Sequence, residues 1–502
     1  MISKVFSCAF TGLDCQTIEV QADISSGMPS FNIVGLGDTS VHESRERVKS
    51  SIKNCGLLFP QNRKTINLSP AKLRKHGTHF DLPIAISMLL ASQQIPPEDF
   101  NDAIFVGELS LTGKIKPIEG SLLIAQHAKE EGFKRIFLPQ ANAVEAGFIE
   151  GIEIYPLEDL QEFIKYAQNK HLKPKTSTKI QPENCRDYRT FNNILGLSVA
   201  KRALQVAAAG GHNVLFQGPP GCGKTLLCRA FHCLLPEMTI DEILQTSKIF
   251  SIAGKTDEKN PLIKERPFRE VHPTGSLVSL IGGGNPPKPG EISLANNGVL
   301  FLDEIAEFQS KMLESLRQPL EDRKIIITRQ NHATVFPANF ILLATMNPCS
   351  CGFFGDEKIR CICSESNIRN YEKRISGPLK DRFDIILKIN RSPMGQIFNK
   401  GNEIPGHIRA KSIDHAQKAQ LTRFFHHPDI QKNADMQLAH IRKFCLLNEQ
   451  NKKTLDDLAV QKHLSNRAYL KIIKLARTIA DLEKSEEIQK HHLMEAVQFR
   501  AN

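Results

Sequence analysis

The sequence predicts an α/β protein in which helices flank a parallel sheet, with a separate α+β domain before it and a helical domain after it. Two patterns predict the sheet. The short apolar run Val214-Leu215-Phe216 leads into a glycine-rich segment and then into a segment that can continue as a helix. A second apolar run, 298–302, ends in two adjacent carboxylates. Both patterns indicate buried strands that each deliver polar groups to the loop that follows.

The glycine-rich segment is a phosphate-binding loop in its expected setting between strand and helix. Its backbone N–H groups and the positive end of the following helix would hold the phosphates of ATP. Lys224 would reach the β and γ oxygens, and Thr225 would place its hydroxyl on Mg²⁺. The predicted nucleotide-binding residues are Gly218, Pro219, Pro220, Gly221, Cys222, Gly223, Lys224, Thr225 and Leu226. We therefore expect a protein that binds and hydrolyses a nucleoside triphosphate.

The second apolar run adds the acidic half of such a site. Asp303 suits a Mg²⁺ partner, and Glu304 suits the residue that polarises the attacking water. Without the phosphate-binding loop, the same run would be interpreted only as a core strand with an acidic end.

Length and composition limit the alternatives. A chain of 502 residues is too long for one core and predicts two to four domains. No segment approaches the roughly 18 consecutive apolar residues of a membrane span, and the amino terminus lacks a secretory pattern, so we expect a cytoplasmic protein with reduced cysteines. The formal charge of +11 favours an anionic partner, nucleic acid before membrane.

The pattern divides the chain into four parts. Residues 1–165 alternate β-like runs with helical stretches, including a helix near 41–55 and a hairpin at 112–114. Residues 166–185 are polar and predict an exposed linker. Residues 186–392 form the predicted ATPase core. Residues 393–502 predict a helical lid, in which Tyr469, Ile472, Ile473, Ala476, Ile479 and Ala480 share one helical face.

Three further polar residues follow the acidic strand in a suggestive order. Asn347 ends the apolar run 340–346, Arg382 follows the core helices, and Arg467 opens a helix of the lid. Each arginine alone is more often a solvated surface charge. The complete order resembles AAA+ ATPases. That resemblance implies a sensor role for Asn347, a finger role in a neighbouring subunit's site for Arg382, a lid role for Arg467, and a homo-hexameric ring.

Longer segments narrow the resemblance. The runs 289–295, 316–321, 376–382, 207–213 and 474–482 resemble the ComM/YifB family of magnesium-chelatase-like AAA+ proteins, and the similarity covers nearly the whole chain. The resemblance implies an ATP-dependent helicase that drives branch migration of three-stranded intermediates during integration of transforming DNA, with single-stranded and branched DNA as its partners. It leaves two alternatives open, a magnesium-chelatase-type ATPase and an ATPase that remodels a protein partner.

The amino-terminal domain resembles the Lon-type protease fold through the segments 80–86 and 107–118. Ile84 occupies the position of the family's nucleophilic serine, and residues 121–124 contain no lysine. A Ser/Lys dyad cannot act without its nucleophile or its base. The resemblance therefore implies a proteolytically inactive domain, used either for assembly and partner contacts or for stability alone.

Four cysteines are grouped directly after Asn347. Cys349 and Cys351 form one Cys-x-Cys pair, and Cys361 and Cys363 form a second after nine residues. Four neighbouring thiolates suit a structural tetrahedral Zn²⁺ site, although zinc fingers more often have longer spacers within each pair. Free cysteines or a redox pair remain the alternatives.

Two predicted hairpin insertions supply the DNA contacts. One surrounds 282–290 and the other spans 325–336, where two β runs flank a polar turn. In related ATPases such hairpins face a central pore. Lys288, Arg329 and His332 at their tips would hold DNA phosphates, or would be ordinary solvated turn residues.

Overall fold

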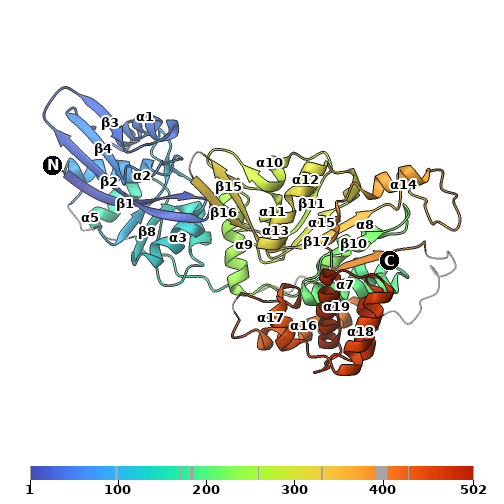
Figure 1. The fold of residues 1–502 in the computed structure, drawn as a ribbon. Helices are drawn as coiled ribbons and strands as arrows, with labels where there is room; N and C mark the ends of the chain where they lie inside the picture. The colour runs from blue at the N-terminus through green and yellow to red at the C-terminus, as the bar shows by residue number, and fades with distance from the viewer. Residues whose placement is uncertain are drawn as a thin grey trace.

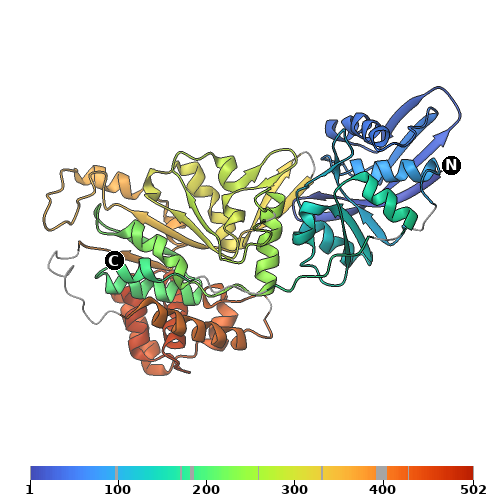
Figure 2. The same cartoon turned by 180° about the vertical axis from the view of Figure 1, so that it is seen from behind.

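A computed structural model shows three parts that follow one another along the chain (Figure 1). The structure describes residues 2–96, 100–169, 172–180, 186–257, 259–329, 332–391, 404–427 and 429–500. The amino-terminal domain lies at one end, the central domain lies in the middle, and the carboxy-terminal helices pack along one side of the central domain, as the reverse view also shows (Figure 2). Within the described residues, no helix is long and apolar enough to cross a membrane.

A mixed seven-stranded sheet organises the described part of the amino-terminal domain, in the order β3-β4-β2-β1-β5-β8-β9. β1 and β2 form a long antiparallel hairpin, whereas β5, β8 and β9 join in parallel. The elements are β1 (Ile2–Thr11), β2 (Asp14–Ser25), β3 (Ser30–Val34), α1 (Thr39–Asn54), β4 (Arg63–Ser69), α2 (Asp81–Ala91), β5 (Ala103–Phe105), β6 (Glu108–Leu109), β7 (Ile115–Lys116), α3 (Ser121–Glu130), β8 (Arg135–Pro139), α4 (Ala143–Ala146), β9 (Glu153–Leu157) and α5 (Leu160–Asn169). The predicted helix and hairpin of this domain correspond to α1 and to the antiparallel pair β6 and β7.

The central domain contains a five-stranded sheet in the order β11-β14-β17-β10-β18, in which every neighbouring pair is parallel. This arrangement confirms the predicted α/β sheet. Its elements are α6 (Arg189–Asn193), α7 (Ser198–Gly210), β10 (Val214–Gln217), α8 (Lys224–Ala230), α9 (Ile240–Ile252), β11 (Phe268–Val271), α10 (Leu277–Ile281), α11 (Glu291–Leu294), β14 (Val299–Leu302), α12 (Ser310–Ser315), α13 (Arg317–Asp322), β17 (Ile341–Met346), α14 (Glu365–Glu372), α15 (Gly377–Lys380) and β18 (Ile385–Lys388). Because parallel strands end at the same edge, the loops after β10, β14 and β17 meet there.

Both predicted insertions are hairpins. β12 (Gly282–Gly283) pairs with β13 (Lys288–Pro289), and β15 (Lys324–Arg329) pairs with β16 (His332–Pro337). The hairpins touch each other, since a Cβ on Gly282 would lie 3.0 Å from Cδ1 of Ile327. Arg329 and His332 face each other at the end of the second hairpin, and residues 330–331 lie outside the described residues.

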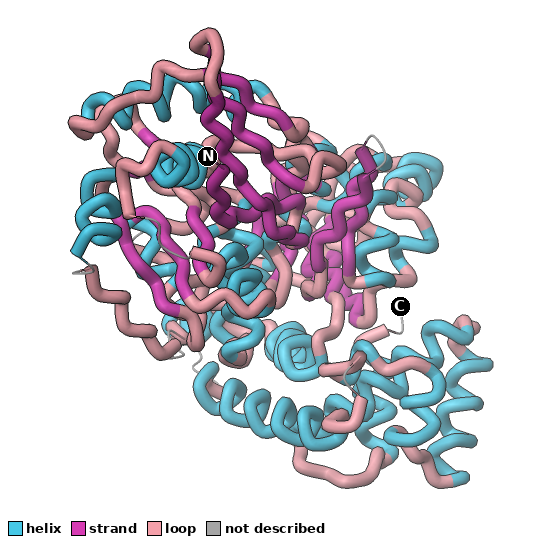
Figure 3. Tube along the Cα trace, turned by 90° about the vertical axis from the view of Figure 1, so that its left-hand side faces the viewer, coloured by secondary structure: helices cyan, strands magenta, loops and turns pink. Residues whose placement is uncertain are grey.

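The described carboxy-terminal part consists of helices joined by loops and contains no strand, as the end-on view shows (Figure 3). They are α16 (Gly406–Arg423), α17 (Leu438–Phe444), α18 (Glu449–Gln461), α19 (Asn466–Leu482) and α20 (Lys490–Gln498). The predicted apolar face of α19 is confirmed, because Ile472, Ile473, Ala476, Ile479 and Ala480 are buried. This face joins the same hydrophobic cluster as α7 and β10, so the helices share a core with the central sheet.

The connection between the first two domains begins later than the sequence indicates. Helix α5 continues to Asn169, with Tyr166 buried, because its apolar side packs on the amino-terminal core. The following residues 172–180 are mostly exposed, but Lys175 forms a β-bridge with Ile154, and the Thr178 N–H donates to the Gly147 carbonyl. The first part of the stretch expected to be an exposed linker therefore belongs to the folded domain.

The amino-terminal domain also packs directly on the central domain. Met238, Ile243 and Leu262 share a hydrophobic cluster with the helices and strands of the amino-terminal sheet. At the turn between β1 and β2, a Cβ on Gly12 would lie 2.2 Å from Cγ2 of Thr334, so the turn approaches β16 closely. In Figure 1 the β15–β16 hairpin accordingly reaches toward the amino-terminal sheet.

Candidate nucleotide-binding site and cysteine cluster

The phosphate-binding loop leaves β10 and turns into α8, as its motif requires. Gly221 and Gly223 have φ angles of 78° and 89°, in the left-handed region that favours glycine. Gly218 has another constraint, since a Cβ there would lie 2.2 Å from the carbonyl oxygen of Ile389. Helix α8 begins at Lys224, so its first N–H groups point toward the loop. The local geometry suits an anion at this helix terminus.

Lys224 lies at the centre of the loop and is 7% exposed. Its ammonium donates to the carbonyls of Gly218 and Pro219 at 2.7 and 2.9 Å, and to Oδ1 of Asn347 at 3.2 Å. Burial lowers the pKa of Lys224 from its ordinary value, while nearby thiol and carboxyl groups oppose that effect. The predicted sensor asparagine thus touches the predicted phosphate-binding lysine.

The Asp303 carboxylate accepts hydrogen bonds from two threonine hydroxyls. Thr225 donates to its two oxygens at 3.1 and 3.0 Å, and Thr345 donates to Oδ1 at 2.5 Å. The Thr345 hydroxyl also accepts the Glu304 N–H at 2.9 Å. Glu304 is exposed and has φ of 52°, an uncommon conformation for a residue other than glycine. Thr345 therefore orients both acidic residues, a role that its place within an apolar strand did not indicate.

The two predicted arginines lie apart from this group. Arg382 follows α15, is 12% exposed and forms an ion pair with Glu321 within the same chain. Arg467 is exposed in the first turn of α19. In the described part of the chain, neither arginine contacts Lys224, Thr225 or Asp303 by a hydrogen bond or ion pair. Their predicted roles stay predictions.

Close to Arg382, a buried ion pair joins the core to the carboxy-terminal helices. Lys471 of α19 lies 2.8 Å from Asp384, and the His212 ring lies 3.7 Å from the same carboxylate. Burial opposes the charge on Asp384, but Lys471 and His212 hold its pKa well below the ordinary value. The residue directly before β18 is thereby fixed to α19.

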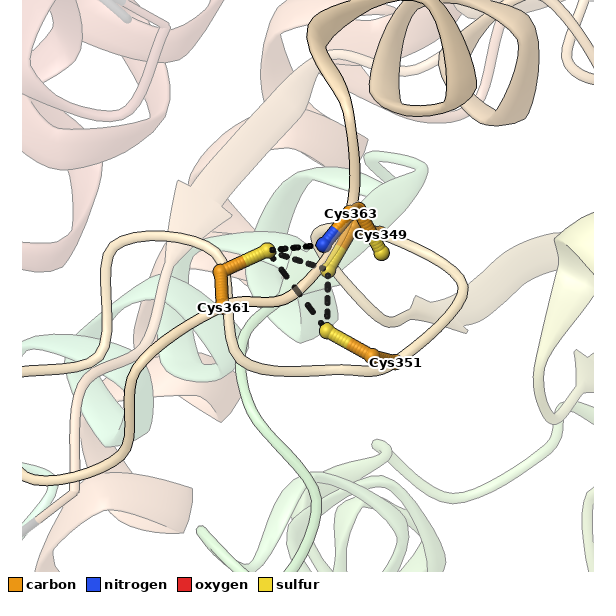
Figure 4. A group of neighbouring side chains, drawn as sticks. All are labelled: Cys349, Cys351, Cys361 and Cys363. Atoms are coloured by element: carbon orange, nitrogen blue, oxygen red, sulfur yellow. Dashed lines mark hydrogen bonds between the residues drawn. The ribbon is translucent and has the colours of Figure 1, made fainter.

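The four cysteines converge from the two ends of one loop (Figure 4). The Sγ of Cys349 lies 3.3 Å from that of Cys351 and 3.7 Å from that of Cys361, and Cys351 and Cys361 are 3.5 Å apart. All four Sγ atoms lie within 4.8 Å of one another. A tetrahedral zinc with bonds of about 2.3 Å places its sulfurs about 3.8 Å apart, so the cluster fits that ion.

Backbone donors support thiolates at this cluster. The Phe354 N–H donates to Cys349 Sγ at 3.3 Å, and the Cys363 N–H donates to Cys361 Sγ at 3.4 Å. Backbone N–H groups of Phe353 and Ile362 lower the pKa of Cys351 to about 6. The Cys363 N–H acts in the same direction on Cys361, but burial and the neighbouring thiols raise the pKa of Cys361 to about 12, so the cluster holds one readily formed thiolate beside a protonated thiol. The thiolate, rather than the thiol, is the form that binds metal.

The predicted DNA contacts are only partly described. Lys288 is half-exposed and forms a 2.8 Å ion pair with Glu119 of the amino-terminal domain. The structure gives backbone positions for Arg329 and His332 and does not describe their side chains. The sequence did not predict the partner of Lys288, because the pair is formed between two domains.

The amino-terminal positions that the sequence resemblance predicted to replace a protease dyad are buried. Ile84 lies inside α2 with no exposure, and Leu122 and Ile124 are buried in α3. Ser121 donates its hydroxyl to Glu145, which also accepts from Thr256 of the central domain at 3.3 Å. Ile84, Leu122 and Ile124 therefore pack in the core of the amino-terminal domain, and Glu145 joins that domain to the central domain.

Comparison with known proteins gives matches along the entire chain. The family described as magnesium chelatase, subunit ChlI, matches residues 190–397, and two related families, of the same subunit and of its carboxy-terminal region, match 20–142 and 407–500. Competence protein ComM of Haemophilus influenzae is 38% identical, covering 100% of this chain and 97% of that protein. YifB of Escherichia coli is also 38% identical, with the same coverage of both chains. The magnesium-chelatase 67 kDa subunit of Chlorobaculum tepidum is 27% identical, covering 32% of this chain and 23% of its own.

Proposed function

Because the chain belongs to the ComM/YifB family of magnesium-chelatase-like AAA+ proteins, we propose that it is an ATP-driven DNA motor that promotes branch migration when transforming DNA is integrated. The observation that carries the proposal is the full-length similarity to a competence protein, and the grouping of Lys224, Asp303 and Asn347 at one sheet edge supports it. Family models named for magnesium-chelatase subunit ChlI match most of this chain, but the chelatase subunit of Chlorobaculum tepidum aligns with only 32% of it. ComM aligns along the full length, so the comparisons favour a ComM-like activity over the chelatase reaction.

The residues at the sheet edge have complementary tasks in ATP hydrolysis. The N–H groups of the phosphate-binding loop and the Lys224 ammonium bind the phosphates. Thr225 and Asp303 would hold Mg²⁺, which neutralises charge on the β and γ phosphates when bound. Glu304 orients the attacking water, with its backbone fixed by Thr345, and Asn347 lies beside Lys224 where the γ-phosphate would end.

A ring of subunits would complete the site. Arg382 acts on a neighbouring subunit's nucleotide in this proposal and would leave its ion pair with Glu321 to do so. Arg467, exposed on α19, would approach the nucleotide from the lid. Six subunits in a closed ring would place the two hairpins around a common axis.

The proposed DNA contacts are the two hairpins. They touch each other, they carry Lys288, Arg329 and His332, and the protein has a net charge of +11. Contacts to phosphates give little base specificity, which suits a motor that accepts many sequences. The amino-terminal domain, a proteolytically inactive relative of the Lon fold in this proposal, packs on both hairpins through Gly12 and Glu119.

We also propose a structural zinc ion at Cys349, Cys351, Cys361 and Cys363. The sulfur spacing and the N–H donors to sulfur support a metal over an isolated redox pair. Zinc would hold the loop closed and takes no part in hydrolysis.

A branch-migration assay tests the proposed function. A labelled three-stranded DNA junction is incubated with protein and ATP, and with Lys224→Ala or Glu304→Gln in parallel. The proposal predicts strand exchange that needs hydrolysable ATP and is lost in both variants. ATP hydrolysis without any strand movement or DNA binding would refute it and would favour an ATPase that acts on a protein partner.

A further inference from the structure

We propose that the cysteine knuckle, residues 349–363, is a metal-held clasp on the phosphate-binding loop, so that metal occupancy sets the affinity for nucleotide. Gly352 of the knuckle and Arg391 outside it provide two contacts between the knuckle and the loop, and Asn347 provides a third link. The inference rests on the proposed function of the loop as an ATP site and concerns what fixes the conformation of that loop.

The first contact is steric. Gly352, at φ of 85°, lies against Pro220 of the phosphate-binding loop, and a Cβ at this position would approach Pro220 Cδ to 2.8 Å. Real Cβ atoms do not approach a neighbour that closely, so any larger side chain pushes the knuckle and the loop apart. The knuckle therefore packs on the nucleotide loop without a gap at this point.

Arg391 provides the second contact and bridges the two segments. Its Nη2 donates to the Pro220 carbonyl at 3.3 Å, and its Nε lies 3.1 Å from the carboxylate of Asp356, which is 3% exposed. The guanidinium also lies over the Phe353 ring, with its carbon 5.7 Å from the ring centre. Arg391 thus contacts the knuckle through the charge of Asp356 and the ring of Phe353, and it contacts the nucleotide loop through a hydrogen bond.

A third link runs through the chain itself. Asn347 accepts a hydrogen bond from Lys224 and lies two residues before Cys349, the buried cysteine of the cluster. A cavity of about 200 Å³ is lined by Gly218, Asn347, Gly355 and Arg391, so the knuckle also forms one wall beside the start of the nucleotide loop. An ion bound to the four sulfurs would fix the positions of all three contacts at once.

Matched variants separate the loss of a contact between the knuckle and the nucleotide loop from a general effect of substitution on the knuckle. Gly352→Ala and Gly355→Ala impose the same left-handed backbone strain, because Gly355 has φ of 78°, but a Cβ on Gly355 meets no atom within 4 Å. Arg391→Ala and Arg360→Ala each remove one positive charge from this region, and Arg360 is exposed and has no hydrogen bond to the nucleotide loop among the described contacts.

The test measures zinc by atomic emission and affinity by fluorescence anisotropy of a labelled ATP analogue with Mg²⁺, on the full chain without DNA. We expect one zinc per chain in the wild type and in all four variants. Gly352→Ala and Arg391→Ala should bind the analogue about tenfold more weakly, and the two controls within about twofold of wild type. Cys351→Ser with Cys363→Ser should lose zinc and weaken binding by a similar factor.

Equal affinity in Gly352→Ala, Arg391→Ala and their controls would overturn the clasp, and so would a wild-type protein that binds no zinc when it is supplied. Because the measurement contains no DNA, it is independent of the motor proposal. A protein that binds the analogue in this pattern but ignores DNA would refute the motor and support the clasp.

Discussion

Replacing Thr345 with valine removes a hydroxyl and keeps the shape of the side chain. In the structure this hydroxyl donates to Asp303 at 2.5 Å and accepts the Glu304 N–H at 2.9 Å. A hydrogen bond to a charged group contributes about 1.5–3 kcal/mol, and an unpaired N–H costs about 1–3 kcal/mol. If about 3 kcal/mol of this total is lost from the transition state, kcat falls roughly a hundredfold.

The assay is steady-state ATP hydrolysis together with binding of an ATP analogue. Thr345→Val should bind the analogue with about wild-type affinity, because the phosphate contacts of Lys224 are unchanged, and Thr345→Ser should retain most of the rate. Thr334→Val is the matched control, because the Thr334 hydroxyl is buried and has no hydrogen-bond partner among the described residues. A Thr345→Val protein within about threefold of the wild-type kcat would refute the assigned role.

Two further predictions concern the amino-terminal domain. Glu119→Gln frees Lys288 from its half-exposed ion pair and should raise DNA affinity up to about fivefold at low salt, whereas Lys288→Ala should weaken DNA binding and reduce its salt dependence by about one phosphate contact. Filter binding across salt concentrations checks both variants. Unchanged affinity in both would exclude Lys288 from the DNA interface. Burial lowers the pKa of His79 to about 4, below the ordinary value near 6.5. Between these two pH values the unfolded chain binds a proton that the folded chain does not. The free energy of unfolding therefore falls by up to about 3 kcal/mol as the pH drops from about 6.5 to 4. Denaturant unfolding at pH 7 and pH 5 measures the part of this loss that falls between those pH values, about 2 kcal/mol, and His79→Gln should reduce it. An identical pH dependence in the variant would assign the loss to other groups.

The sequence predicts those parts of the structure that depend on local pattern. The strand before Gly218, the acidic strand before Asp303 and the run before Asn347 are short apolar segments with polar ends, and all three are neighbouring parallel strands. Parallel pairing then brings their ends together, so the grouping of Lys224 with Asn347 follows from motif order.

Other features depend on contacts between distant segments, which no local pattern reveals. Thr345 is one polar residue inside an apolar strand, and only its position opposite Asp303 shows its use. Lys288 resembles a free cation at a hairpin tip until Glu119 of another domain is placed beside it. The late end of α5 has a similar origin, because the tertiary burial of Tyr166 extends the helix into a polar stretch.

DNA-stimulated ATP hydrolysis tests the central claim most directly. Steady-state rates are measured for the wild-type protein with no DNA, with single-stranded DNA and with forked DNA, and for Lys224→Ala under the same conditions. The account predicts a rate that rises severalfold with DNA and is abolished in the variant. Hydrolysis that depends on Lys224 but is identical with and without DNA would contradict a DNA motor.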